Sequence, residues 1–221
     1  MLALVGSGEY LPPMEAVDRY LLASLSHEGR VVCLPTAAGA EGKERIAYWS
    51  ALGVEHFSRL GAHVEALPVI DRASADDAAL ASRIRRANFV YLSGGSPGYL
   101  LKTLKGSLAW KAILEVLQSG GILAGCSAGA MVIGARIPGF PAWKPAFNLL
   151  PGAVIVPHFD ELSPNFVRLI RLWAGRRQTL FGIEGNTALV VNGNRLRVVG
   201  SGKVVVWGRE GRSTWTEGTG N

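Results

Sequence analysis

Long apolar runs are missing from this sequence of 221 residues. No run approaches the ~18 apolar residues of a membrane span, so we expect no membrane partner. The first residues, MLALVGSGEYLPP, also lack the basic start and long apolar core of a signal peptide. Cysteine is scarce, and Cys33 and Cys126 alone do not make a disulfide framework. Together these absences predict a cytoplasmic protein.

Motifs for cofactors and nucleic acids are missing as well. The sequence has no Walker motif, no metal-ligand cluster and no full G-x-G-x-x-G, so we expect neither a cofactor nor a metal. The net charge of +6 invites a nucleic-acid interpretation. However, the basic stretches at 83–86 and 168–177 lie on amphipathic patterns, and no aromatic-basic stacking motif accompanies them. We therefore predict a solvated basic surface, which also helps to draw in acidic substrates.

Short apolar strands alternate with helical patterns over the first two thirds of the chain. Continuous apolar strands separated by helices are typical of a parallel sheet that is covered on both faces. The pattern predicts one α/β domain over residues 1–221, a three-layer sandwich with a mostly parallel central sheet. The strands are expected at residues 2–5, 30–35, 63–69, 89–92 and 122–125.

The pattern changes after residue 150. A strand and a helix are followed by four short strands with tight turns, among which VNGN and GSGK are hairpin signals. These predict a C-terminal antiparallel meander on the edge of the sheet. The last residues, 209–221, are polar and glycine-rich, and we expect a frayed, flexible tail there.

The sequence GCSAG, residues 125–129, lies directly between an expected strand and a helix. This is the G-x-S-x-G pattern of a nucleophile elbow, in which a sharp turn exposes the central serine above the sheet. The central residue is Ser127, so Cys126 is expected to be a buried small side chain instead. The amide of Ala128 is then a donor for an oxyanion. A tight turn without chemistry is the alternative.

A nucleophilic serine needs a base, and the sequence has four histidines. His27 lies in a polar loop, His56 lies within a helix, and His63 starts a strand at the end opposite the site. Only His158 follows a strand on the side of Ser127, which favours it as the base.

The base needs an orienting acid, and no Asp or Glu lies between Ser127 and His158. The acid must then come later or from an earlier strand end. Asp160 and Glu161 are judged too close along the chain to orient the ring. Glu184 ends an apolar strand and is the preferred partner.

A second oxyanion donor is expected in SGGSPG, residues 93–98. An amide of Gly94 or Gly95 could face Ser127 without a side chain in the way. A plain glycine-rich turn is the competing interpretation.

The segments FVYLSGGSPGYLL, GGILAGCSAGAMVIG, VPHF and FGIEGNTALVV together resemble the aspartyl dipeptidase (dipeptidase E) and cyanophycinase family of serine peptidases. The resemblance implies a flavodoxin-like fold of the class I glutamine-amidotransferase type and a Ser-His-Glu triad. Carried over by position, it implies Ser127 as nucleophile, His158 as base and Glu184 as acid, with Gly95 and Ala128 as the oxyanion amides. One departure concerns the substrate loop, where the family has Asn and then Gln or Thr but this chain has Ser96 and Pro97.

The resemblance further implies small peptide substrates, above all dipeptides with an N-terminal aspartate. An aspartate site needs a cation, and Arg168 or Arg171, on the helix after His158, is a candidate, although both could lie on a solvated face. Glu9 could bind a substrate ammonium or cap a turn, and Ser96 lies in the substrate loop. We expect a monomer or a homodimer. The alternatives are a cyanophycinase-type peptidase, a glutamine-amidotransferase-like amidohydrolase, which would place cysteine at the elbow centre, and a non-catalytic binding protein.

Overall fold

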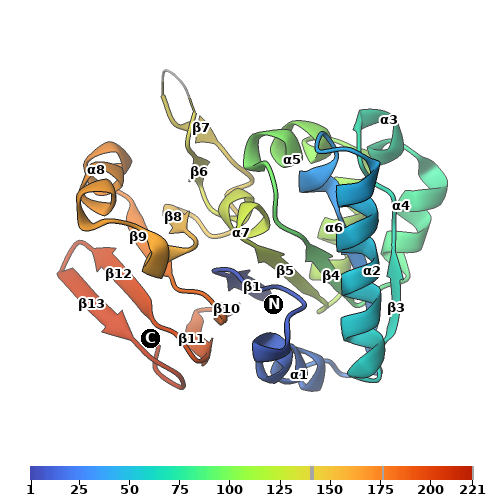
Figure 1. Ribbon diagram of the computed structural model, residues 1–221, viewed down its shortest axis with the longest axis horizontal. Helices are drawn as coiled ribbons and strands as arrows, with labels where there is room; N and C mark the ends of the chain where they lie inside the picture. The colour runs from blue at the N-terminus through green and yellow to red at the C-terminus, as the bar shows by residue number, and fades with distance from the viewer. Residues whose placement is uncertain (140–141, 176, 221) are drawn as a thin grey trace.

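A computed structural model describes residues 1–139, 142–175 and 177–220 of the chain. A seven-stranded sheet in the order β11-β10-β1-β5-β4-β2-β3 forms its centre (Figure 1). Five of these strands are parallel, and β10 and β11 join one edge antiparallel. The strands are β1 (Leu2–Val5), β2 (Arg30–Leu34), β3 (His63–Ala66), β4 (Phe89–Leu92), β5 (Ile122–Cys126), β10 (Thr187–Asn192) and β11 (Arg195–Gly200).

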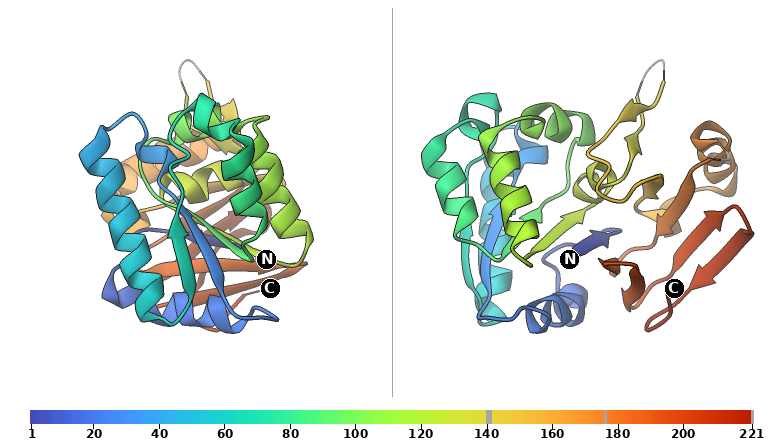
Figure 2. Two further views of the ribbon diagram at one scale, coloured as in Figure 1. Left: turned by 90° about the vertical axis from the view of Figure 1, so that its right-hand side faces the viewer. Right: turned by 180° about the vertical axis from the view of Figure 1, so that it is seen from behind.

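Helices cover both faces of this sheet. In the left view of Figure 2, α2 lies on one side of the strands and α4 and α6 on the other. The α-helices are α1 (Glu15–Ala23), α2 (Lys43–Arg59), α3 (Arg72–Ala75), α4 (Ala78–Arg85), α5 (Pro97–Leu104), α6 (Leu108–Gln118), α7 (Ala128–Ile133) and α8 (Pro164–Ala174). Short 3-10 helices are η1 (Pro12–Met14), η2 (Thr36–Ala38) and η3 (Phe159–Glu161). None of the helices in the described ranges is long and apolar enough to span a bilayer.

Two apolar cores explain the layers, because successive residues of a strand point to opposite faces. Leu2 and Leu4 of β1 pack into the core under α4, α5 and α6. Ala3 and Val5 pack into the other core, under α1 and α2. Strands that are buried on both faces read as continuous apolar runs, as the sequence indicated. The predicted fold class, a mostly parallel α/β sandwich with antiparallel C-terminal strands, is confirmed.

The C-terminal strands differ from a simple edge meander because they divide between two sheets. The VNGN turn does form a hairpin between β10 and β11. At GSGK, however, the chain passes to a second, four-stranded sheet in the order β13-β12-β9-β8. That sheet consists of β8 (Ala153–Val156), β9 (Thr179–Ile183), β12 (Val204–Gly208) and β13 (Gly211–Trp215). A two-stranded ribbon, β6 (Arg136–Ile137) with β7 (Lys144–Pro145), precedes it.

Part of the segment that we expected to fray is a strand. Residues 211–215 form β13, which pairs antiparallel with β12 along its whole length. Gly218 and Thr219 then exchange backbone hydrogen bonds with Val198 of β11. Polar composition did not prevent strand formation, because the ladder satisfies the backbone groups while residues 211–214 stay exposed.

Candidate active site

A strained turn joins β5 to α7 at Ser127. The serine has φ 48° and ψ −108°, a conformation that non-glycine residues adopt only when their surroundings impose it. Both flanking glycines are needed, because a Cβ on Gly125 would lie 2.4 Å from the Gly129 carbonyl carbon. A Cβ on Gly129 would lie 2.4 Å from the carbonyl oxygen of Leu92. Backbone therefore packs on backbone at this turn, and Ser127 is held at the carboxyl edge of the sheet, as predicted.

His158 follows β8 by two residues and reaches Ser127. Its Nε2 lies 3.1 Å from the Ser127 Oγ. Its other ring nitrogen, Nδ1, lies 3.0 Å from Oε1 of Glu161, with the His158 and Glu161 side chains 39% and 62% exposed. Like Ser127, His158 has a positive φ, 51°, at the start of η3. The predicted pairing of Ser127 with His158 is therefore present in the geometry.

Among the described residues, no hydrogen bond or ion pair joins Glu184 to His158. Glu184 Oε2 instead accepts a hydrogen bond of 2.9 Å from the Lys203 amide. Asp160 also turns away, and its Oδ1 accepts from the Gly185 amide at 2.9 Å. The expectation that Glu161 lies too close along the chain is wrong, because η3 folds residue 161 back towards residue 158.

Among the backbone amides near Ser127, those of Gly95 and Ala128 have no protein acceptor within the described ranges. The sequence left Gly94 and Gly95 open as the second donor. The Gly94 amide is already engaged, because it donates to Glu9 Oε1 at 2.8 Å. A serine hydroxyl beside an imidazole, with unengaged amides nearby, is suited to attack on a carbonyl group.

Cys126 points away from the cavity into the core under α1 and α2. It is fully buried, and its Sγ donates to Glu9 Oε2 at 2.9 Å. Burial, and then the negative charge of Glu9, raise the pKa of the Cys126 thiol well above its ordinary value. A protonated, buried thiol is a poor nucleophile, which agrees with the expectation drawn from its place in the turn.

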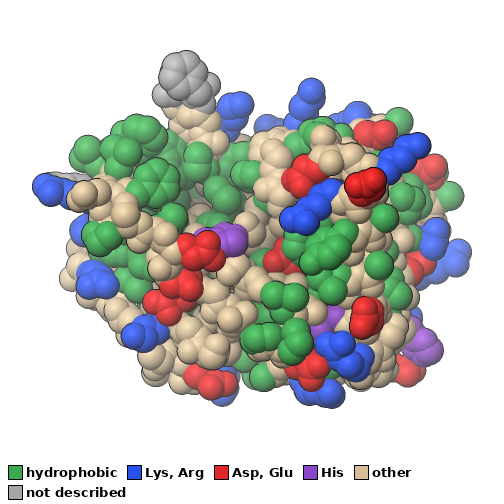
Figure 3. All heavy atoms as spheres, in the orientation of Figure 1, with side chains coloured by type: hydrophobic (Ala, Val, Ile, Leu, Met, Phe, Trp, Pro, Cys, Tyr) green, Lys and Arg blue, Asp and Glu red, His purple; other side chains and the backbone are tan. Residues whose placement is uncertain are grey.

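A cavity of about 330 Å³ opens beside Ser127 and His158. Its far wall was not predicted and comes from α2 and the segment after β1. Figure 3 shows hydrophobic side chains gathered over α2, flanked by basic and acidic ones. The sequence carries a signal for this wall, since four of its residues recur at helical spacing with aromatic side chains among them. The unpredicted lining residues are Leu11, Arg45, Tyr48, Trp49 and Leu52.

Arg45 is the cation of this cavity. Its guanidinium lies 5.0 Å from the centre of the Trp49 ring and 5.2 Å from that of Tyr48. Its Nε lies 3.6 Å from Oε2 of Glu41, one turn earlier. Stacking on two rings holds the guanidinium at the cavity while leaving its two terminal NH2 groups available as donors.

The arginines suggested by the sequence lie elsewhere. Arg168 and Arg171, on α8, line a cavity with Trp207 of the second sheet, and neither borders the cavity beside Ser127. Ser96 caps α5, where its Oγ accepts from the Tyr99 amide at 3.3 Å, and it is not a lining residue either. Proximity along the chain to His158 was the wrong guide, because the helix that follows it packs on the second sheet.

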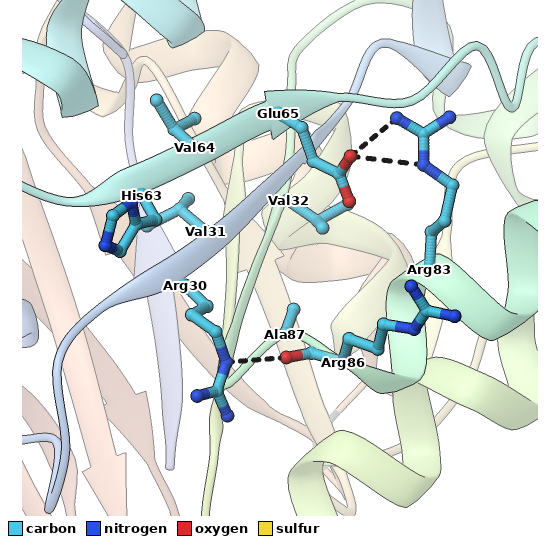
Figure 4. Close-up of a pocket in the computed structure, with 9 residues that line it drawn as sticks. All are labelled: Arg30, Val31, Val32, His63, Val64, Glu65, Arg83, Arg86 and Ala87. Carbon is cyan, nitrogen blue, oxygen red and sulfur yellow. Dashed lines mark hydrogen bonds and ion pairs between the residues drawn. The ribbon is translucent and has the colours of Figure 1, made fainter.

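A pocket of about 260 Å³ lies at the amino ends of β2 and β3 (Figure 4). It contains His63, which confirms that this histidine is at the end of the sheet opposite Ser127. Two arginines at its rim are already engaged: Arg83 pairs with Glu65, and Arg30 Nε donates to the Arg86 carbonyl. The other histidines are also remote, since His27 is exposed between α1 and β2 and His56 is buried against Asp18.

Comparison with known proteins adds a family to this geometry. The model of peptidase family S51 matches residues 2–199. The uncharacterized peptidase Lmo0363 of Listeria monocytogenes is 27% identical over 178 residues, which are 75% of this chain and 83% of that protein. The uncharacterized peptidase Lin0382 of Listeria innocua is 33% identical over 107 residues, 48% of each chain.

Solved structures agree with the sequence relatives. The crystal structure of a peptidase from an acI-B1 Actinobacterium superposes with a TM-score of 0.88 at 35% identity, covering 100% of this chain and 95% of that one. A putative peptidase E from Listeria monocytogenes has the same fold, with a TM-score of 0.68 at 21% identity over 91% of this chain and 98% of the other.

Proposed function

The chain belongs to peptidase family S51 and is a serine peptidase; we propose that Ser127 is its nucleophile and that it hydrolyses small peptides through an acyl-enzyme. The observation that carries the proposal is the 3.1 Å contact between Ser127 Oγ and His158 Nε2 at a strained strand-to-helix turn. In α/β hydrolytic folds such a turn exposes the reacting hydroxyl above the sheet.

The reaction follows from the atoms that meet there. His158 Nε2 takes the hydroxyl proton as Ser127 Oγ bonds to the carbonyl carbon of the scissile peptide. The carbonyl oxygen becomes an oxyanion, which the amides of Gly95 and Ala128 stabilise. The imidazolium gives its proton to the leaving amine, the C–N bond breaks and an ester on Ser127 remains. Water, deprotonated by the same ring, then hydrolyses the ester.

Glu161 takes the role of the orienting acid in this proposal. Its carboxylate lies 3.0 Å from His158 Nδ1, where it fixes the tautomer that leaves Nε2 free to accept a proton. The set remains Ser-His-Glu, as the family resemblance implied, but with Glu161 where the sequence favoured Glu184. Because the Glu161 side chain is largely exposed, water screens its charge and its contribution is smaller than that of a buried triad acid.

The substrate that we propose is a small peptide with an N-terminal aspartate, as the resemblance implies. Arg45 supports this choice, because the guanidinium is a charge partner for a carboxylate in the cavity that holds Ser127. Leu11, Tyr48 and Trp49 add an apolar wall against which the rest of the peptide can pack. The volume of about 330 Å³ suits a ligand of dipeptide size.

Labelling with a fluorophosphonate probe tests the nucleophile. Wild type and Cys126→Ala should be labelled, and Ser127→Ala should not, with circular dichroism confirming that each variant is folded. Labelling that survives in Ser127→Ala, or that is lost only in Cys126→Ala, contradicts the assignment.

Rates on matched peptides test the substrate. Asp-X should be cleaved faster than Asn-X by tenfold to more than a hundredfold, because losing a charge-assisted hydrogen bond costs about 1.5–3 kcal/mol. Arg45→Met should erase the difference without preventing probe labelling. Arg168→Met and Arg171→Met are the controls and should preserve it. Equal rates of wild type on Asp-X, Asn-X and Leu-X would remove the acidic specificity.

A further inference from the structure

Two consecutive residues after β1 hold the loop that follows β4. Glu9 Oε1 accepts from the Gly94 amide at 2.8 Å, and the Tyr10 hydroxyl lies 3.0 Å from Ser93 Oγ. Glu9 and Tyr10 are 6% and 2% exposed, so these contacts are shielded from water. A buried hydrogen bond to a carboxylate is stronger than one between neutral groups at the surface.

The same loop is fixed on its other side. The Ser96 amide donates to the Ala37 carbonyl at 2.9 Å. Gly95 has φ +136°, and a Cβ there would lie 2.7 Å from the Ala37 carbonyl carbon, so only glycine fits. The amides on both sides of Gly95, those of Gly94 and Ser96, are therefore hydrogen-bonded, while the Gly95 amide itself has no protein acceptor among the described residues.

The segment that carries Glu9 is itself constrained. Gly8 precedes it with φ +86°, and Tyr10 follows it with φ 65° although it is not a glycine. A Cβ on Gly8 would lie 2.3 Å from Asn186 Oδ1, and the Asn186 amide donates to the Ser7 carbonyl at 3.0 Å. Positive-φ backbone at Tyr10 persists only because the packing around it over-determines the conformation. The constrained backbone on both sides of Glu9 thus fixes the position from which its carboxylate reaches the loop after β4.

The second oxygen of Glu9 reaches the elbow. Oε2 accepts from Cys126 Sγ at 2.9 Å, one residue before Ser127. The thiol stays protonated, as its raised pKa requires, and so remains a donor to the carboxylate. One buried carboxylate therefore connects three segments: the end of β1, the glycine loop after β4 and the turn that carries Ser127.

We propose that Glu9 is a positioning residue that aims the Gly95 amide at the oxyanion formed on attack by Ser127. The inference rests on the proposed function and deepens it. It replaces the idea that Glu9 binds a substrate ammonium, because Glu9 is 6% exposed and each of its carboxylate oxygens already accepts from a protein donor. Glu9 acts through Gly94 and Cys126, and the contact with the reacting oxygen is made by Gly95.

Steady-state kinetics of Glu9→Ala and Glu9→Gln on an Asp-X peptide test the proposal, with rates normalised to the fraction of molecules that a fluorophosphonate labels at completion. Glu9→Ala should lower kcat about 100-fold and leave KM within about twofold, because loss of one oxyanion donor costs about 10²–10³ in kcat. Glu9→Gln should stay within about tenfold of wild type, since its amide oxygen still accepts from Gly94. Asp18→Asn, which removes another buried carboxylate, is the control and should keep kcat per labelled molecule.

Binding of inhibitors separates positioning from general damage. A peptide aldehyde, which forms a tetrahedral adduct with a serine, should bind Glu9→Ala about 100-fold more weakly, while free aspartate binds equally well. The inference is overturned if Glu9→Ala keeps kcat. It is also overturned if KM rises for dipeptides with a free amino group but not for their N-acetylated forms, which would return the ammonium role to Glu9. Activity that persists in Ser127→Ala would instead overturn the proposed function.

Discussion

Two histidine–carboxylate pairs in this molecule differ in their exposure to solvent: one is buried and the other lies at the surface. His56 Nε2 lies 2.8 Å from Asp18 Oδ2 between α1 and α2, with side chains 1% and 0% exposed. His158 and Glu161 form their pair on η3 at the edge of the cavity, with side chains 39% and 62% exposed. The buried pair is surrounded by rings, including those of Tyr10 and Phe57.

The difference lies in the second ring nitrogen. His158 directs it at the hydroxyl of Ser127, which borders a cavity open to a substrate. His56 directs it at the guanidinium of Arg59, 3.4 Å away, on the same helix. A histidine with a carboxylate partner is therefore a proton carrier only where its other nitrogen has a reacting group to serve. Elsewhere the same kind of pair gives two buried polar side chains a hydrogen-bond partner.

The largest effect is expected on kcat, and only when the histidine of the exposed pair is replaced. His158→Ala should lower kcat by about 10⁴-fold or more, because the serine loses its base. Its free energy of unfolding should change little, since the ring is partly exposed. Rates on Asp-X peptides and urea unfolding curves measure both. Substantial turnover in His158→Ala would place the base elsewhere.

His56→Ala should show the reverse pattern. Removing the ring leaves the Asp18 carboxylate buried without its partner, which costs about 3–5 kcal/mol of stability. The enzyme that remains folded should keep its turnover, as active-site titration will reveal. If His56→Ala were as stable as wild type yet inactive, the buried Asp18–His56 pair would be required for catalysis.

The next comparison concerns the acids. Glu161→Gln should lower kcat by about tenfold to 100-fold, less than in triads with a buried acid, because water already screens the exposed carboxylate. Glu184→Gln is the matched control, with an amide oxygen that still accepts from Lys203, and should retain its rate. A greater loss in Glu184→Gln than in Glu161→Gln would return the orienting role to Glu184.

The smallest expected effect is the pH dependence of the free energy of unfolding that comes from Asp18 of the buried pair. Burial raises the pKa of Asp18 above 3.8, although the hydrogen bond from His56 opposes the shift. As pH rises from 3.8 through the folded pKa, the unfolded chain loses this proton first and the native state binds more protons. The contribution of Asp18 to the free energy of unfolding therefore falls, by at most about 1.4 kcal/mol per pH unit.

Asp18→Asn lacks this titration and serves as its reference. Urea unfolding of both proteins between pH 4 and 7 should show wild type losing stability relative to Asp18→Asn as the pH rises. Parallel curves would mean that Asp18 titrates alike in the folded and unfolded states.

Much of the fold follows from the sequence because its signals are local. Apolar runs such as Phe89–Leu92 are strands buried on both faces, and GCSAG is recognisable because strand, turn and helix are contiguous. The division of the last strands between two sheets is not local. β12 pairs with β9, whose paired residues lie 21 to 27 positions earlier, and nothing in the turn at GSGK distinguishes a hairpin from a passage between sheets.

The site follows the same rule. Ser127 and His158 stand directly after strands, so their place at the sheet edge could be inferred. Glu161 was rejected because the tight winding of η3 cannot be read from residue spacing alone. Arg45 was missed because α2 meets the site only through packing across the sheet edge. A place after a strand thus predicts that a residue lies at this edge of the sheet, but not which partner its side chain contacts, as Glu184 shows, and residues supplied by neighbouring helices are not predicted.

The glycine contacts at the turn of Ser127 have a practical consequence for redesign. A Cβ at Gly125 or Gly129 would clash with neighbouring backbone atoms, so variants at these two positions should be misfolded or inactive. The opposite wall is made of side chains on α2, where Arg45, Tyr48 and Trp49 face the cavity from one helix. In the proposed function, reactivity and selectivity come from separate parts of the chain, and a library over these three α2 positions can test new substrates while the turn at Ser127 stays constant.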